Sequence, residues 1–228
     1  MKKVITLFMM SLALATSLYA QVTFMPKVGT SWSTVSFNED INDQFLGDFD
    51  YGSKAGLIIG IAAEIPLGGD MFSLQGELLF HQKGYTSKYA ESEMSSSYKT
   101  TLNYLELPVL ARVNFGKFYA ATGTYIGFGV GGKYEGSDTY LGYTAQHEGK
   151  VKFGEEPDNY AGSNTYINAF DFGIQMGAGV KVSIIVIDLR FGLGLTDLID
   201  KRDLNTETRN RSLQLTVGFP LRHIEWKH

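Results

Sequence analysis

Apolar and polar residues alternate along much of this chain with a period of two, and the 3.6-residue period of a helix is nearly absent. In residues 184–197, for example, Ile187 and Leu189 alternate with Asp188 and Arg190. Because successive side chains of a strand point to opposite faces, such a segment has one apolar face and one polar or small face. The pattern predicts eight strands: Val22–Phe37, Gly52–Ile65, Phe72–Tyr85, Lys99–Phe115, Phe118–Tyr134, Thr165–Val182, Ile184–Asp197 and Arg209–Leu221.

The predicted strands are long, and their connections alternate between long and short. Most strands reach the ~9–11 residues that a tilted strand needs to cross a bilayer. The long connections are Asn38–Tyr51, Thr86–Tyr98, Glu135–Asn164 and Leu198–Thr208, and the short ones are Pro66–Met71, Gly116-Lys117 and Ser183. Short turns at one end and long loops at the other are typical of bacterial outer-membrane barrels. We therefore predict an all-β fold, a closed antiparallel eight-stranded up-and-down transmembrane β-barrel of the small outer-membrane type.

Aromatic residues lie near both ends of the predicted strands, as the interfacial girdles of a membrane barrel do. The expected girdles are Phe72, Phe115, Phe118 and Phe219 beside the short turns, and Trp32, Tyr51, Tyr85, Tyr98, Tyr104 and Tyr134 toward the long loops. Pro108 falls inside the fourth predicted strand. A closed barrel has no free edge to place it on, so we expect a bulge or a missing ladder bond there.

The composition fits a β-structured membrane protein. The chain has 228 residues, of which 44% are hydrophobic and only 19% charged, against ~25% charged in ordinary globular domains. The net charge of −4, with acids and bases interspersed, argues against a nucleic-acid partner. Cysteine is absent, which excludes a disulfide framework, a thiolate metal site and a cysteine nucleophile.

The first 20 residues read as a secretory signal peptide. Lys2 and Lys3 precede an apolar run from Val4 to Leu14, and cleavage is expected after Ala20. No later segment reaches the roughly 18 apolar residues of a transmembrane helix. We therefore expect an exported protein in the outer membrane, with residues 1–20 as the signal and residues 21–228 as the barrel domain.

Several short motifs are similar to those of a known family. They are Lys54-Ala55-Gly56, Leu74-Gln75-Gly76-Glu77-Leu78-Leu79-Phe80 followed by Gln82-Lys83-Gly84, and Tyr104-Leu105-Glu106-Leu107-Pro108. In these motifs the chain resembles the PorT-like outer-membrane β-barrel family of Bacteroidota. The resemblance spans nearly the whole chain after the signal and implies a barrel. The namesake of the family takes part in protein secretion, but strand motifs of this kind do not specify an activity.

The polar faces of the predicted strands carry acids and bases in balanced number. The interior of an eight-stranded barrel is just filled by side chains, and buried charges there need partners. We predict a structural hydrogen-bonded network in the barrel rather than a proton or ion path, which intramembrane charges can also mark. The residues assigned to it are Glu64, Glu77, Glu106, Arg112, Asp171, Lys181, Asp188 and Arg190, with Lys27 and Lys54 as further bases on these faces.

Three other motifs are weaker. Residues 127–132 fit G-x-G-x-x-G after a strand, but no helix follows, so the glycines are interpreted as room for large neighbours in a narrow barrel. The four histidines lack metal-ligand spacing, and only His147 beside Glu148 suggests a hydrolytic constellation. Acids in residues 38–51 suggest divalent cations at a lipopolysaccharide surface, but no ligand geometry is fixed there. We predict no cofactor and no metal site.

The favoured function is that of a non-enzymatic integral outer-membrane protein, structural or interacting through long extracellular loops. The expected partners are outer-membrane lipid, lipopolysaccharide and envelope proteins. One alternative is an accessory component of an envelope protein secretion or assembly machine. Another is a lipid-modifying outer-membrane barrel enzyme. A conducting pore is not expected, because eight strands leave no open channel.

Overall fold

The computed structural model describes residues 22–37, 50–67, 69–91, 93–154, 165–198 and 208–221. The strands of these ranges are β1 (Thr23–Phe37), β2 (Asp50–Pro66), β3 (Phe72–Glu91), β4 (Met94–Phe115), β5 (Phe118–Tyr140), β6 (Tyr143–Phe153), β7 (Thr165–Ile167), β8 (Phe170–Val182), β9 (Ile185–Gly194) and β10 (Thr208–Gly218). No helix in these ranges is long and apolar enough to cross a membrane. The predicted signal peptide lies outside the described residues.

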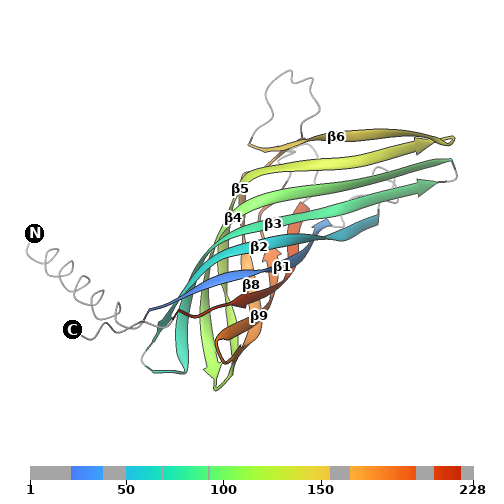
Figure 1. Cartoon of the computed structure of the whole chain (residues 1–228). Coiled ribbons are helices and arrows are strands. Elements are labelled where there is room, and N and C mark those ends of the chain that lie inside the picture. Colours follow the sequence, from blue (N-terminus) through green and yellow to red (C-terminus); the bar gives the residue numbers. More distant parts are fainter. Residues whose placement is uncertain are drawn as a thin grey trace, which may run out of the picture.

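Eight of the strands close into a ring. Their order is β1–β2–β3–β4–β5–β8–β9–β10, and β10 pairs with β1 to complete the circle. Every neighbour in the ring is antiparallel. The predicted closed eight-stranded antiparallel barrel is therefore confirmed (Figure 1).

Three strands continue far beyond the ring as a sheet. The β3–β4 pairing reaches Glu91↔Met94, the β4–β5 pairing reaches Met94↔Tyr140, and β6 joins β5 from Gly132↔Val151 to Tyr140↔Tyr143. Figure 1 shows β3 to β6 running side by side away from the barrel. We call residues 84–91, 94–103, 131–140 and 143–153 the extension.

The extension corrects the expectation of long loops at Thr86–Tyr98 and Glu135–Asn164. The first is a hairpin, and the second continues β5 and turns back at Leu141-Gly142 into β6. Threonine and tyrosine favour strands, but a segment without an apolar face lacks the alternation by which a strand is recognised in a sequence. The predicted strand Thr165–Val182 is divided into two strands, β7 and β8. The other predicted long connections, Asn38–Tyr51 and Leu198–Thr208, lie mostly in residues 38–49 and 199–207, outside the described part of the chain, as do residues 155–164.

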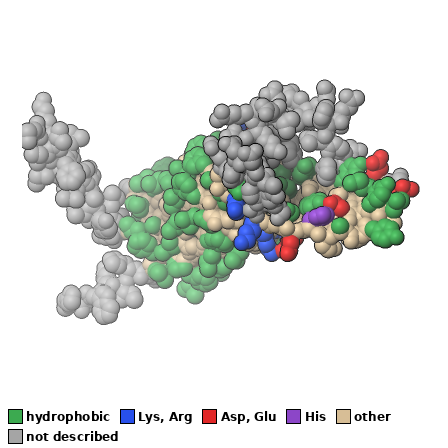
Figure 2. All heavy atoms as spheres, turned by 90° about the horizontal axis from the view of Figure 1, so that it is seen from above, with side chains coloured by type: hydrophobic (Ala, Val, Ile, Leu, Met, Phe, Trp, Pro, Cys, Tyr) green, Lys and Arg blue, Asp and Glu red, His purple; other side chains and the backbone are tan. Residues whose placement is uncertain are grey.

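Side chains of the ring point alternately outward and inward, with the apolar ones outward. On β9, Leu189 and Phe191 are exposed, while Asp188 and Arg190 are buried. Hydrophobic side chains cover the visible barrel surface in Figure 2. A soluble barrel would show the opposite arrangement, so the pattern is that of a barrel surrounded by lipid.

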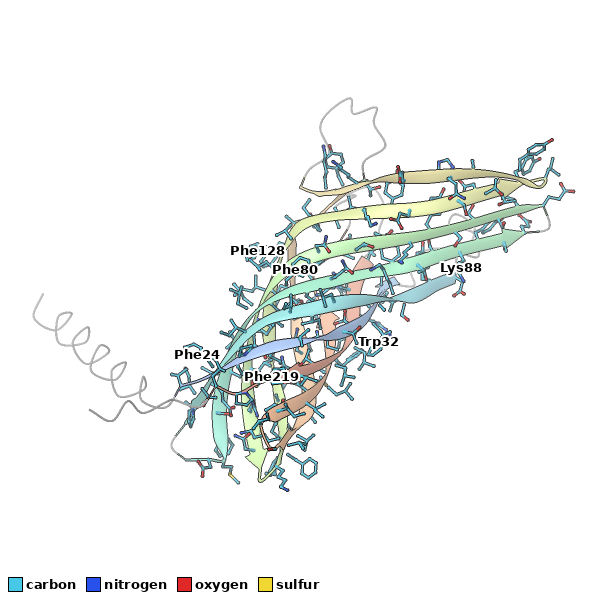
Figure 3. The ribbon with its side chains drawn as sticks, in the orientation of Figure 1. Phe24, Trp32, Phe80, Lys88, Phe128 and Phe219 are labelled. Atoms are coloured by element: carbon cyan, nitrogen blue, oxygen red, sulfur yellow. The ribbon has the colours of Figure 1, made fainter. Side chains whose placement is uncertain are left out.

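Aromatic side chains mark both ends of the outward apolar surface. Phe24 and Phe219 lie toward the short turns, whereas Trp32 and Phe128 lie nearer the extension (Figure 3). The expected turn-side residues Phe72, Phe115, Phe118 and Phe219 are all exposed, as is Trp32.

The other predicted girdle residues do not face lipid. Tyr104 is completely buried inside the barrel. Because Leu105 and Leu107 occupy the outer face of β4, the period of two directs Tyr104 inward. The remaining tyrosines, Tyr51, Tyr85, Tyr98 and Tyr134, line a cavity where the extension leaves the barrel.

The ladder of β3 and β4 is interrupted at Pro108, as expected. Assigned partners stop at Gly76↔Val109 and resume in the same register at Leu79↔Glu106. The proline has no N–H to donate, so a ladder bond is missing, but no bulge forms at this position. The pairing of β4 with β5 instead shifts register between Asn103 and Tyr104, where β5 carries one extra residue, Val130, as the two strands pass from the barrel into the extension.

Candidate functional site

Four charged side chains from β1, β3 and β9 form a cluster in the middle of the barrel, which we call the central cluster. The Lys27 ammonium lies 2.9 Å from Glu77 and 3.2 Å from Asp188. The Arg190 guanidinium donates to both oxygens of Glu77, at 2.7 and 2.9 Å, and its Nε donates to Asp188 at 2.8 Å. Tyr119 adds a hydroxyl donor to Asp188 at 2.8 Å. Two cations face two anions, so the cluster is balanced in charge.

A second group surrounds Arg112, nearer the short turns. Its guanidinium lies 3.2 Å from Glu64, hydrogen-bonds Gln75 and sits 3.6 Å from the centre of the Tyr119 ring. Lys181 reaches Glu64 at 3.7 Å, but the Lys181 side chain is 41% exposed. Glu64 and Lys181 also line a cavity at this end of the barrel. They therefore stand at the rim, whereas Arg112 is buried.

The third group, the upper cluster, lies toward the extension. Lys83 binds both Glu106, at 2.6 Å, and Asp171, at 2.9 Å. His81 Nδ1 lies 2.8 Å from the other oxygen of Glu106. The ammonium of Lys83 also sits 4.4 Å from the centre of the Tyr125 ring, a favourable cation–π geometry. One lysine thus faces two carboxylates, and His81 is a further polar partner of Glu106.

The structure brings six of the eight predicted network residues into the buried interior and places Glu64 and Lys181 at its edge. Lys54 is buried but belongs to none of the three groups, and its ammonium donates to the backbone oxygen of Ala55. The prediction did not include Lys83 and His81. Both share the inward face of β3 with Glu77 at even spacing, so the period of two was a usable signal.

Sequence reasoning also missed three inward tyrosines, and glycines make room for two of them. A Cβ at Gly179 would lie 2.3 Å from the Tyr119 ring, and one at Gly173 would lie 2.5 Å from the Tyr125 ring. In the G-x-G-x-x-G segment, a Cβ at Gly129 would collide with Phe153 at 2.1 Å. These glycines therefore admit large aromatic neighbours inside a narrow barrel.

An apolar layer lies between the upper cluster and the outer part of the extension. It consists of Val35, Leu102, Tyr104, Val151, Ile167 and Leu198, all buried. On β4, Leu102 and Tyr104 follow Glu106 toward the extension, so the layer caps the charged interior. We call it the apolar cap.

His147 lies on the extension, and its acidic partner is Asp138 rather than Glu148. Its Nε2 is 3.2 Å from the Asp138 carboxylate, and its ring stacks on Tyr98. The Tyr98 hydroxyl donates to Asp138 at 2.6 Å. This bond lowers the pKa of Asp138 and raises the pKa of Tyr98 to about 12. The nearby hydroxyl is thus bound to the carboxylate and not to the imidazole, which is not the order of a nucleophile–histidine–acid triad.

Among the described residues, no three His, Asp or Glu side chains gather as a metal site would require. The acidic segment suggested for divalent cations falls mostly in residues 38–49, outside the described ranges.

A family model described as an outer membrane protein beta-barrel domain matches residues 18–200. The chain belongs to this family. The match, together with the closed ring and its apolar outer surface, identifies an integral barrel of the outer membrane. No curated protein matches the chain.

Solved barrels cover most of the chain at low identity. They include Ail, the attachment invasion locus protein of Yersinia pestis (10% identity, 88% of this chain and 99% of that one, TM-score 0.40), and Neisserial surface protein A (9%, 87% and 97%, 0.41). The outer membrane protease OmpT of Escherichia coli is similar to the same degree (8%, 88% and 95%, 0.42). Likenesses this distant do not transfer an activity.

Proposed function

We propose that this outer-membrane barrel is a non-enzymatic anchor that presents the extension outside the cell as an interaction surface. The filled, charge-paired interior supports the role of an anchor, because such a core favours a rigid barrel over a conduit. We propose that the charged groups around Arg112, Arg190 and Lys83 serve this structural role.

One observation carries the proposal: the far end of the extension presents large exposed apolar side chains beside the acids Glu91 and Glu93. The exposed fractions are 45% for Met94, 59% for Tyr140, 55% for Leu141 and 84% for Tyr143. We call these four residues the tip. Leu141 has a φ of +49°, a left-handed conformation that is costly for a leucine. Exposed apolar residues and local strain both favour a binding role over a merely structural turn.

Lipid contacts fit the other end of the extension. Lys99 and Lys133 are exposed on the part of the extension nearer the barrel, and Lys88 is exposed farther out along β3 (Figure 3). At the level just outside the bilayer, these ammonium groups suit the phosphates of lipopolysaccharide. The aromatic and aliphatic outer surface of the ring suits the acyl chains.

The test compares the native chain with a tip variant carrying Tyr140→Ser, Leu141→Asn and Tyr143→Ser, each expressed in cells that lack the gene. We expect both proteins to show the heat-modifiable gel mobility of a folded barrel. Envelope proteins that cross-link to the native chain in intact cells should be lost from the tip variant. A control with Glu135→Ser and Glu148→Ser changes two exposed residues nearer the barrel, and this variant should retain the cross-linked proteins. An unchanged set of cross-linked proteins in the tip variant contradicts the proposal.

A role as an accessory component of a secretion or assembly machine is the second candidate. It is favoured by the PorT-like motifs, among them Tyr104 to Pro108, which lines the barrel interior on alternate residues. Loss of secreted proteins from the medium on deletion of the gene would support it. A change in lipid A mass on deletion would instead contradict the non-enzymatic role and support a lipid-modifying enzyme.

A further inference from the structure

A cavity of about 320 Å³ lies where the extension leaves the barrel. Tyr51, Tyr85, Tyr98 and Tyr134 line it from four neighbouring strands, β2 to β5. The rings of Tyr51 and Tyr85 are 6.1 Å apart and inclined at 52°. The volume is at the lower end of the ~300–1,000 Å³ of small-molecule sites, so the cavity suits a small ligand.

The floor of the cavity is closed off from the charged interior. Leu102, Val151, Ile167 and Leu198 line the cavity and also belong to the apolar cap. A ligand seated here therefore contacts aliphatic side chains below and aromatic rings at the side. It does not reach the upper cluster around Lys83.

The polar groups of the cavity are neutral hydroxyls. Ser87, Thr100, Thr165 and Thr208 line it together with the tyrosines, and the lining that the structure describes contains no charged side chain. An ionised ligand would lose its hydration without gaining an opposite charge. A wholly apolar ligand would cover hydroxyl groups without offering them a hydrogen bond. The ligand that fits is neutral, with apolar faces and hydrogen-bonding edges.

We propose that this cavity binds a neutral sugar ring. The C–H faces of such a ring pack on tyrosine rings and aliphatic side chains, and its hydroxyls exchange hydrogen bonds with the serine and threonine hydroxyls. The site is independent of the tip, about which the proposed function makes its claim. The sugar is either a free saccharide or a neutral sugar of a membrane-anchored glycolipid, since both present the same chemistry.

The test measures binding to the full chain, refolded in micelles of lauryldimethylamine oxide, a detergent that has no sugar headgroup. The probes are maltose, lactose, cellobiose and diacetylchitobiose, with glucuronic acid as an anionic probe and toluene as an apolar one. Saturation-transfer NMR detects binding, and titration calorimetry gives the dissociation constant. A second sample in phospholipid nanodiscs, with and without lipopolysaccharide, distinguishes the two sources. If the glycolipid is the ligand, lipopolysaccharide should compete with the free sugar.

Two serines of the extension give a matched pair of variants. Ser87→Trp fills the cavity, whereas Ser97→Trp adds the same ring on the other face, because the neighbouring Tyr98 is the residue that points into the cavity. Tyr85→Leu removes a stacking ring but keeps apolar bulk. We expect Ser87→Trp to abolish sugar binding, Ser97→Trp to preserve it, and Tyr85→Leu to weaken it about tenfold, as loss of an aromatic contact predicts.

Heat-modifiable mobility verifies that each variant is folded before binding is compared. The proposal is overturned if no neutral sugar binds at about 10 mM, a concentration that detects even millimolar affinity. It is also overturned if Ser87→Trp binds as the native chain does, or if only toluene or only glucuronic acid binds in a way that depends on Ser87.

Discussion

The barrel and the extension are built from the same strands but face different surroundings. In the barrel half of β4, Leu105 and Leu107 face lipid while Glu106 is buried against a cation. In the extension half, serine, threonine and tyrosine occupy both faces, and ionic contacts such as Lys133–Glu135 are exposed. The neighbouring strands β4 and β5 thus pass from the barrel interior, where an unpaired charge is costly, to the extension, where the loss of an ionic partner has little effect on stability. The energetic weight of a charge therefore depends on its position along one strand.

The largest difference should appear when a charge is removed. Arg190→Ala leaves Glu77 and Asp188 with only Lys27 as a cation, and removing one partner from a buried ion cluster costs about 3–5 kcal/mol. Lys133→Ala on the extension should leave the free energy of unfolding unchanged, because its partner stays in water. Denaturant titration of both variants refolded in lipid vesicles gives the comparison. If Arg190→Ala and Lys133→Ala changed the free energy of unfolding equally, the central cluster would not be shielded from water.

The outer surface gives the next largest difference. Leu189→Arg places a cation on the lipid face of β9 and should destabilise the barrel by about 2–4 kcal/mol if it lies near the bilayer midplane. Tyr143→Arg puts the same side chain at the exposed tip and should leave stability unchanged. The same vesicle titration measures both. A harmless Leu189→Arg would mean that this face of β9 does not contact lipid.

The period of two accounts for how much of the barrel could be predicted. It placed Asp188 and Arg190 on one face of β9 and Leu189 on the other, because in lipid the alternation is strict. His81 and Lys83 follow the same rule, but buried Leu79 interrupts the polar run between Glu77 and His81 and obscured the network on β3. Within one barrel strand, the alternation of apolar and polar residues therefore predicts which face each residue occupies.

The extension and the tyrosine-lined cavity escaped prediction for a different reason. The parts of β3 to β6 that form the extension have water on both faces, so apolar and polar residues do not alternate there. A polar sequence of this kind looks the same whether it forms a loop or a strand. The cavity arises where four strands bring Tyr51, Tyr85, Tyr98 and Tyr134 together. Their sequence positions suggested a lipid-facing girdle. Tyr85 and Tyr98 continue the inward alternation of β3 and β4, so the period of two could have placed them. Tyr51 and Tyr134 reach the cavity only because the pairing register shifts between β2 and β3 and between β4 and β5, which the sequence does not reveal.

A smaller effect is expected at the strained turn of the extension. Leu141 adopts a left-handed conformation before Gly142, at φ values of +49° and +83°. Asparagine tolerates this conformation, so Leu141→Asn should stabilise the hairpin by about 1 kcal/mol. Slower hydrogen exchange of the β5 and β6 amides measures the gain, and the barrel amides serve as the internal control. Faster exchange in the variant would show that packing of the leucine outweighs the strain.

The smallest effect concerns acidification of the extension. The hydrogen bond from Tyr98 holds the pKa of Asp138 below its ordinary value, so the folded hairpin favours the charged carboxylate. The resulting stability is fully present above the ordinary aspartate pKa and is lost as the pH falls through the lowered value. Because the pair is largely exposed, the loss should not exceed about 1 kcal/mol. Hydrogen exchange of the β5–β6 amides, extrapolated to a common intrinsic rate, should show weaker protection at pH 3 than at pH 6. Asp138→Asn should remove this pH dependence while leaving the barrel amides as they are, and a dependence that survives the substitution would assign it to another group.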